Sequence, residues 1–157
     1  MDRRLYVLLR TAGHSPAAER AVRAFSKLGE HGLGWQALAL GGAALDERRR
    51  HAWLRAWATI AGSFAANQAV KLAVRRPRPD VPGLPPLTHT LSNRSYPSAH
   101  ATTSAAAARA LSPLVPAEAL WPVAIAMTFS RVYLGVHWPS DSVAGFALGV
   151  AFAELAT

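Results

Sequence analysis

SRVYLGVHWPSD, residues 130–141, joins two apolar segments near the carboxyl end of the chain. It places Arg131, His137 and Asp141 six and then four residues apart, in a part of the sequence that otherwise suits a nonpolar environment. Ionisable groups in such segments are costly to bury and are usually retained for function. The stretch therefore predicts a functional site where two apolar helices meet.

Composition limits the kind of protein that the chain can form. Its 157 residues suit a single domain, 1–157, in which 51% of the residues are hydrophobic and 17% are charged. The charged fraction is below the quarter that is usual in globular proteins. Cysteine is absent, which excludes a disulfide framework and thiolate metal ligands. A net charge of +8 at pH 7 favours an anionic partner: lipid headgroups, nucleic acid or a phosphorylated substrate.

The placement of the basic residues favours a membrane over nucleic acid. They lie at the edges of apolar segments, as the flanking cations of membrane helices do, and are not interleaved with aromatic stacking residues. The stretch MDRRLYVLLRTAGHS, residues 1–15, lacks a full apolar core and a cleavage site, so we interpret it as part of the mature protein. We expect membrane lipids, and no nucleic acid, among the partners.

An amphipathic helix is expected near the amino terminus. Ser15 is a favourable helix cap, and Pro16 suits the first helical position. Val22, Phe25 and Leu28 then share one face. The pattern predicts an interfacial helix within residues 1–30 that lies on the membrane surface; the alternative is an ordinary surface helix packed on a core.

Five apolar segments follow and predict an all-α fold. They cover about residues 32–45, 53–74, 99–115, 119–134 and 140–157. Most are shorter than the roughly 20 residues of an ideal membrane span, but they are rich in Ala and Gly, which allow close helix packing in lipid. The expected fold is an integral membrane helical bundle of about five short spans in the cell membrane, with a soluble all-α bundle as the alternative. Residues 75–97 contain six prolines and should form a loop at one membrane face.

The polar residues lie at the ends of the second and fourth segments and at the starts of the third and fifth. If the spans alternate in direction, these four ends lie at the same face of the membrane. The polar residues are Lys71, Arg75, Arg76, Arg78, Ser98, His100, Arg131, His137 and Asp141. Taken singly, an arginine at a span end can be an anchor, a histidine can be a packed polar residue, and an aspartate can favour a helix dipole. Those separate explanations do not account for the convergence, which predicts one site.

The cationic residues suit an anion of phosphate type. Lys71, Arg78 and Arg131 would supply fixed positive charge, and arginine can bind phosphate oxygens bidentately. Ser98 precedes a helix whose free backbone N–H groups favour a bound anion.

The histidines suit phosphoryl transfer. Of His100 and His137, one would attack phosphorus and the other would protonate the leaving oxygen. Asp141 follows His137 by four residues and would hold its imidazole in the attacking tautomer.

These residues resemble the three signature motifs of the type 2 phosphatidic-acid phosphatase superfamily. The motifs are Lys71, six residues, then Arg78-Pro79; Pro97-Ser98-Ala99-His100; and Ser130-Arg131, five residues, His137, three residues, Asp141. They have the family's order and internal spacing, within residues 71–141. The sequence departs from the family at Ala99, where glycine is usual, and this bears on how closely the backbone approaches phosphate.

The resemblance implies a role for each motif residue. His137 would be the nucleophile that forms a phosphohistidine, Asp141 its orienting partner, and His100 the general acid. The phosphoryl oxygens would be bound by Lys71, Arg78, Ser98 and Arg131, helped by the backbone amides of Ala99 and His100. The family uses no metal, so neither a metal site nor a cofactor is expected.

Two further stretches resemble actinobacterial members of the family: FSKLGEHGLGW at 25–35 and DERRRHAWLRA at 46–56. Those members remove the 5-phosphate from decaprenylphosphoryl-5-phosphoribose in the synthesis of arabinan precursors for the cell wall. The expected function is therefore a membrane lipid phosphatase with this lipid-linked phosphorylated substrate.

Other functions stay open. The same class includes phosphatases of polyprenyl pyrophosphate, phosphatidylglycerophosphate and phosphatidic acid. Soluble vanadate haloperoxidases share the phosphate-binding motifs, but the apolar helices argue against one. A non-catalytic lipid-binding protein is opposed by the intact His100, His137 and Asp141. The sequence leaves open whether the site faces the cytoplasm or the exterior, and it is compatible with a homo-oligomer.

Overall fold

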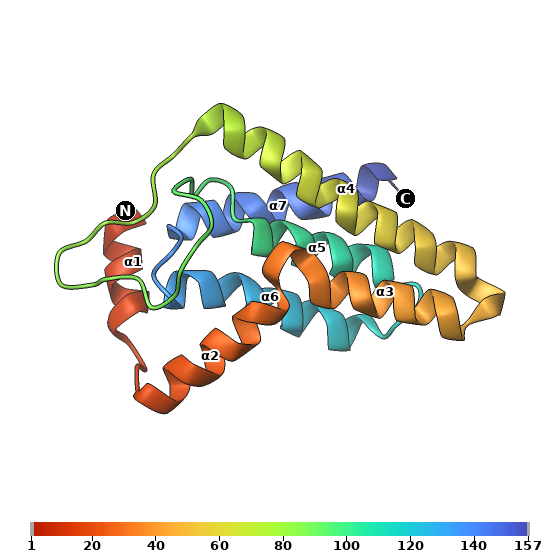
Figure 1. Ribbon diagram of the computed structural model, residues 1–157, viewed down its shortest axis with the longest axis horizontal. Helices are drawn as coiled ribbons and strands as arrows, with labels where there is room; N and C mark the ends of the chain where they lie inside the picture. Colours follow the sequence, from red (N-terminus) through yellow and green to blue (C-terminus); the bar gives the residue numbers. More distant parts are fainter. Residues whose placement is uncertain (1, 157) are drawn as a thin grey trace.

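The computed structural model describes residues 2–156, so the ends of the expected domain, residues 1 and 157, lie outside the described residues. Within this range the chain is all-helical, apart from one isolated β-bridge between Pro77 and Arg94. The helices are α1 (Asp2–Thr11), α2 (Pro16–Leu28), α3 (Leu33–Leu45), α4 (Arg50–Val74), α5 (Ala99–Leu111), α6 (Ala117–Tyr133) and α7 (Pro139–Ala156), with short 3-10 turns η1 (Glu30–Gly32) and η2 (Glu47–Arg49) (Figure 1). The all-α prediction is confirmed.

The five expected apolar segments correspond to α3–α7, and the structure differs from the expectation in two places. The amino-terminal region, described from residue 2 to residue 30, contains two helices instead of one, because the chain turns at Gly13, whose φ is 69°. The second of these begins as predicted, with Ala18 N donating to Ser15 Oγ at 3.1 Å. The segment expected to reach residue 115 ends at Leu111, because Pro113 cannot continue the helix.

The central helix of the bundle is α5, which contacts α4, α6 and α7 (Figure 1). Its alanines are buried, and small side chains allow neighbouring backbones to approach closely. Its buried hydroxyl groups pair with neighbouring helices: Asn67 Nδ2 donates to Thr102 Oγ1 and Trp35 Nε1 donates to Ser104 Oγ, both at 2.9 Å. The core is therefore formed by close backbone packing and a few polar contacts between helices.

The closest packing in this core is between α5 and α7, at Gly149. A Cβ atom there would lie 2.2 Å from the carbonyl oxygen of Thr102 and 3.0 Å from the Cβ of Ala105. Neither atom can move without shifting α5. Gly145, one turn earlier, has the same relation to Ser98, whose carbonyl oxygen would be 2.5 Å away. The two glycines thus fix how near α7 lies to the start of α5.

Four helix ends meet at one end of the bundle. There α4 and α6 end, α5 and α7 begin, and α1 and the loop of residues 75–98 lie beside them (Figure 1). This is the arrangement that alternating helices predict.

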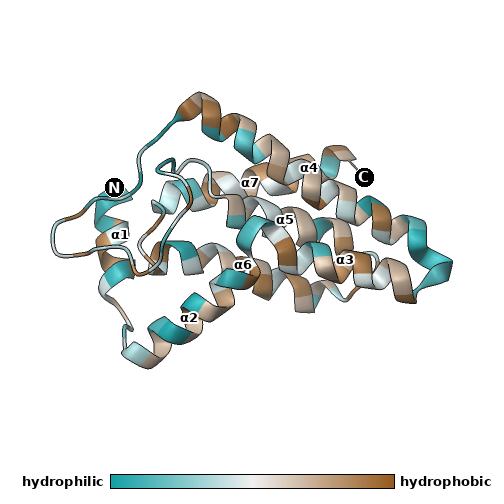
Figure 2. Cartoon of the chain, in the orientation of Figure 1, coloured by the Kyte–Doolittle hydropathy of each residue, from teal (hydrophilic) through white to brown (hydrophobic). Residues whose placement is uncertain are grey.

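Hydropathy is unevenly distributed over the bundle. Figure 2 shows hydrophilic residues concentrated along α2 and at the turn between α3 and α4. Large apolar side chains are nevertheless exposed on the outer faces, among them Leu72 (54%), Phe129 (57%) and Val143 (70%). No helix within residues 2–156 combines the length and the mean hydropathy of a membrane-crossing segment.

Substituting Gly149→Ala should destabilise the protein by about 1–3 kcal/mol, because the added methyl group must push α7 away from the α5 backbone. Gly41→Ala on α3 is the matched control: no described atom lies within 4 Å of its added Cβ, and alanine favours a helix. Thermal unfolding of the two purified variants measures the difference. Equal melting temperatures would contradict the packing described for α5 and α7.

Candidate active site

A cavity of about 130 Å³ lies at the end of the bundle where the four helix ends meet. Six of the eight predicted site residues line it: Lys71, Arg78, Ala99, His100, Arg131 and His137. The other two, Ser98 and Asp141, are fully buried, and Ser98 N donates to the carbonyl oxygen of Asp141 at 2.9 Å. That bond joins the start of α5 to the start of α7.

A second, larger groove of about 500 Å³ lies between α1, α6 and α7. Its described lining is almost wholly apolar and contains none of the predicted site residues. The chemistry of the fold is therefore concentrated in the smaller cavity.

His137 lies in the segment between α6 and α7 and is 2% exposed. Burial lowers the pKa of its imidazole well below the ordinary value, and the positive charges of Arg78, Arg131 and Lys71 lower it further. Arg78 Nη1 lies 3.3 Å from His137 Nε2. Because a guanidinium can only donate, this contact requires Nε2 to accept and places the ring proton on Nδ1. A neutral imidazole that carries its lone pair on Nε2 can act as a nucleophile.

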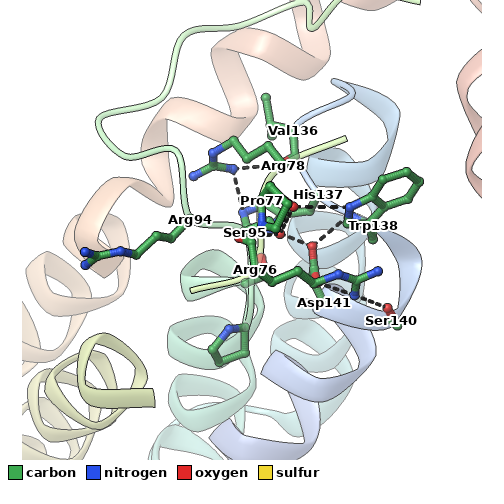
Figure 3. Close-up of polar contacts among 12 residues, drawn as sticks. Arg76, Pro77, Arg78, Arg94, Ser95, Val136, His137, Trp138, Ser140 and Asp141 are labelled. Carbon is green, nitrogen blue, oxygen red and sulfur yellow. Dashed lines mark hydrogen bonds and ion pairs between the residues drawn. The ribbon is translucent and has the colours of Figure 1, made fainter. Parts of the chain in front are cut away.

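The carboxylate of Asp141 lies beside His137, but it is held mainly by other groups. Its Oδ2 is 3.6 Å from His137 Nδ1, longer than a hydrogen bond, and accepts from Trp138 N at 2.9 Å. Its Oδ1 accepts from Arg76 Nη1 at 2.8 Å (Figure 3). The predicted pairing of Asp141 with His137 is therefore an electrostatic contact in this structure, and Arg76 makes the direct ion pair.

Arg76 also connects the site to the amino terminus. Its Nη2 donates to Asp2 Oδ2 at 2.8 Å, and the Ser140 hydroxyl donates to the same oxygen at 2.6 Å. Further along α1, the Tyr6 hydroxyl donates to the carbonyl oxygen of Gly135 at 3.2 Å. Helix α1 thus supports the segment that carries His137 and the first turn of α7.

The three predicted phosphate-binding cations are fixed by neutral acceptors. Arg78 donates through Nε to Ser92 O at 2.7 Å and through Nη1 to Val136 O at 2.6 Å. Burial lowers the Arg78 pKa to about 10, against the opposing effect of Asp141, so the guanidinium stays charged at neutral pH. Lys71 Nζ donates to the carbonyl oxygen of Arg94 at 3.4 Å. Carbonyl groups orient these cations without neutralising them.

Three buried donors in this region lack partners. Ser98 Oγ, Arg131 Nε and His137 Nδ1 have no hydrogen-bond partner among residues 2–156. Buried polar atoms are normally satisfied, so these donors have capacity to bind a ligand. Lys71 and Arg131 are also buried, each 6% exposed, and Arg78 is half-buried. Buried like charges around one cavity favour a bound anion.

His100 lies in the first turn of α5, where backbone N–H groups favour an anion. Its Nε2 is 3.1 Å from the carbonyl oxygen of Ser26, which can only accept, so Nε2 carries a proton and Nδ1 is the nitrogen left for a ligand. Arg131 Nη1 donates to the hydroxyl of the same Ser26. The last turn of α2 therefore orients both a histidine and an arginine of the site.

Sequence reasoning missed the parts contributed by Asp2, Arg76 and Ser26. Arg76 was included among the polar residues at the end of the second segment, but its spacing does not distinguish it from Arg75, which is exposed. Ser26 belongs to an amphipathic helix that was expected to lie on a membrane, and its position next to Phe25 gave no sign of burial. Asp2 is an acidic residue in a basic, exposed-looking stretch.

Comparisons with known proteins identify the family of the chain. Residues 52–157 match the PAP2 superfamily. A decaprenylphosphoryl-5-phosphoribose phosphatase of Mycobacterium tuberculosis is 43% identical over 138 residues, which cover 85% of this chain and 76% of that protein.

Two crystal structures share the fold. Aquifex aeolicus LpxE superposes with a TM-score of 0.79 at 20% identity, and the matched region covers 99% of this chain and 93% of the LpxE chain. The transmembrane PAP2-type phosphatidylglycerolphosphate phosphatase of Bacillus subtilis has a TM-score of 0.61 at 26% identity, over 97% of this chain and 90% of its own. The motifs, the cavity that gathers them and these matches agree: the chain belongs to the PAP2 superfamily of phosphatases.

Proposed function

We propose that this protein is a membrane lipid phosphatase that removes the 5-phosphate of decaprenylphosphoryl-5-phosphoribose through a phosphohistidine on His137. The observation that carries the chemistry is a buried imidazole, whose pKa burial lowers, in a cavity lined by Lys71, Arg78 and Arg131. The substrate is supported by the 43% identity to the mycobacterial phosphatase of that name.

The cations and the start of α5 would bind the phosphate. Lys71, Arg78 and Arg131 would neutralise its oxygens, with the unpaired Nε of Arg131 as one donor. The hydroxyl of Ser98, also unpaired among the described residues, and the amide N–H groups of Ala99 and His100 would supply further donors. These donors would bind most strongly when charge develops on the phosphoryl oxygens in the transition state.

The reaction would proceed in two displacements. His137 Nε2 attacks phosphorus, and the bond from phosphorus to the ribose oxygen breaks. His100, which takes up a proton on Nδ1 together with the bound phosphate dianion, gives that proton to the leaving oxygen. Water then attacks phosphorus, His100 takes a proton from the water, and the phosphorus–nitrogen bond breaks. Inorganic phosphate leaves and His137 is restored. Asp141, held by Arg76 and Trp138, would stabilise positive charge on His137 during both steps.

The protein would act as a multi-pass protein of the cell membrane, with α3–α7 as about five short spans and α2 at the interface. Exposed apolar side chains on α4, α6 and α7 and the likeness to a transmembrane PAP2-type enzyme support this placement. The cavity would then lie at the boundary between lipid and water, where a phosphate on a lipid-linked sugar is found.

Replacing the proposed nucleophile should abolish phosphate release. We expect His137→Ala to retain less than about 1% of wild-type activity, because loss of the nucleophile removes the covalent route. Asp141→Asn should retain more, since its carboxylate forms no bond with phosphorus. His51→Ala, an exposed histidine at the start of α4, is the control and should behave as wild type. Folded, membrane-inserted His137→Ala protein with more than a few per cent of activity would exclude a phosphohistidine at this position.

Activity should survive chelation, because within residues 2–156 no three His, Asp or Glu side chains are grouped to hold a metal ion. Vanadate should inhibit, since its trigonal-bipyramidal adduct on His137 would resemble the transition state. Phosphate release is measured with EDTA and with vanadate in parallel. Activity that disappears in EDTA and returns with magnesium would disprove the metal-free mechanism.

The substrate assignment predicts a preference for the sugar-linked phosphate. The assay offers the protein decaprenylphosphoryl-5-phosphoribose and phosphatidic acid together, at equal surface concentration in mixed micelles. The first lipid should be hydrolysed roughly tenfold faster or more. Preferential hydrolysis of phosphatidic acid would overturn the substrate assignment while leaving the phosphatase chemistry in place.

A further inference from the structure

The 3-10 turn η1 lies at the catalytic cavity although none of its residues belongs to the three motifs. Glu30 and His31 both line the cavity, together with Phe64 and Gln68 of α4. Unlike the buried His100 and His137, these two side chains are exposed and so are accessible to a ligand. The turn is thus part of the cavity mouth.

The backbone of this turn is held in an unfavourable conformation. His31 has φ 50° and ψ 15°, in the left-handed region that residues other than glycine seldom adopt. Gln36 Nε2 donates to the His31 carbonyl oxygen at 2.9 Å, and the His31 ring meets the Phe64 ring edge-on at 5.3 Å between centroids. Such strain is maintained where the surrounding structure fixes it and is common at binding sites.

The turn packs directly on the proposed general acid. A Cβ added to Gly29 would lie 2.7 Å from His100 Cδ2 and 2.6 Å from Met127 Sδ. On the other side of the turn, a Cβ on Gly32 would be 3.1 Å from Thr103 Cβ. Glu30 and His31 therefore project from a segment that is fixed against the α5 turn carrying His100.

The geometry of the reaction points the leaving group toward this turn. In a displacement at phosphorus, the attacking His137 and the leaving oxygen lie on opposite sides of the phosphorus atom. The leaving oxygen must contact His100 to receive its proton. The next atoms of the leaving group then pass the residues around His100, and η1 is an exposed segment that packs against His100 there.

The charge of Glu30 indicates what it would bind. It is the one carboxylate among the described residues that line the cavity. It favours the charge of Arg131, but a carboxylate beside an anion site also repels a phosphate. A carboxylate only accepts hydrogen bonds, so its natural ligands are hydroxyl groups. The neighbouring imidazole of His31 and amide of Gln68 add further polar groups at the same wall.

We propose that Glu30 and His31 form a sugar-binding subsite that accepts hydrogen bonds from the hydroxyl groups of the leaving pentose and so sets the choice between a sugar phosphate and a simple phosphate ester. The subsite rests on the proposed function, because it takes the leaving group to be the ribose of the lipid-linked substrate. It adds two specificity-determining residues outside the phosphate-binding motifs.

The test compares kcat/KM for decaprenylphosphoryl-5-phosphoribose with kcat/KM for phosphatidic acid in the wild type, Glu30→Gln and His31→Asn. Asparagine tolerates the left-handed conformation, so His31→Asn removes the imidazole without straining the turn. Glu30→Gln should lower the ratio of the two values by about tenfold, mainly through KM for the pentose lipid, the usual effect of losing a hydrogen bond to a charged group. Glu47→Gln, an exposed carboxylate at the opposite end of the bundle, is the control and should leave the ratio unchanged.

A second arm uses analogues of the pentose lipid that lack one ribose hydroxyl. Removing the hydroxyl that contacts Glu30 should lower kcat/KM of the wild type and have little further effect on kcat/KM of Glu30→Gln. If every analogue lowers kcat/KM by the same factor in the wild type and in Glu30→Gln, the subsite is overturned. The subsite would also be overturned if the ratio of the two kcat/KM values were unchanged in both η1 variants. Equal losses of kcat/KM for both lipids, as expected if Glu30 only balances the charge of Arg131, would overturn it too. Failure of the proposed function gives a different result: the wild type itself would prefer phosphatidic acid.

Discussion

Repulsion among like charges is the constraint on which this structure depends. Lys71, Arg78 and Arg131 line one cavity of about 130 Å³, and two of the three are buried. Cations removed from water are costly unless an opposite charge compensates them. Backbone carbonyls and a hydroxyl orient the three side chains, but these acceptors carry no net charge. The carboxylate of Asp141 is already paired with Arg76. This uncompensated positive charge is the physical basis for proposing that the cavity binds an anion.

The packing of the core and the position of the site depend on the same contact. Close approach of α7 to α5 requires glycine at 145 and 149, and the same approach brings Ser98 N within 2.9 Å of the Asp141 carbonyl oxygen. The first turns of both helices are fixed relative to each other by this bond. Any separation of the two helices would also separate the α5 amide groups from His137. The packing that stabilises the core thus also fixes the geometry of the proposed phosphate site.

The amino-terminal helices complete a site that the bundle alone leaves unsupported. Asp2 and Tyr6 of α1 hold Arg76 and the segment before His137, and Ser26 of α2 contacts both Arg131 and His100. In Figure 1, α1 and α2 lie toward the end of the bundle where α6 ends and α7 begins. They control how the polar groups are oriented more than how the core is packed, since most of the buried apolar residues belong to α3–α7.

The sequence by itself determined the helices and six of the residues that line the cavity. Helix positions follow from local properties: apolar runs, the cap at Ser15, and prolines that end α5 and keep residues 75–97 out of a helix. The six motif residues that line the cavity could be named because their order and spacing resemble a family whose chemistry requires them. The same local signals could not indicate that the predicted amino-terminal helix is divided at Gly13.

Only the tertiary structure decided which groups pair. Asp141 was expected to hold the imidazole of His137, four residues away, yet its direct ion pair is with Arg76, 2.8 Å away in space at the start of the proline-rich loop. Ser26 and Glu30 likewise reach the site from a segment outside the three signature motifs. Hydrogen bonds and ion pairs depend on distances of a few tenths of an ångström between groups far apart in the chain, and local sequence pattern does not encode such distances.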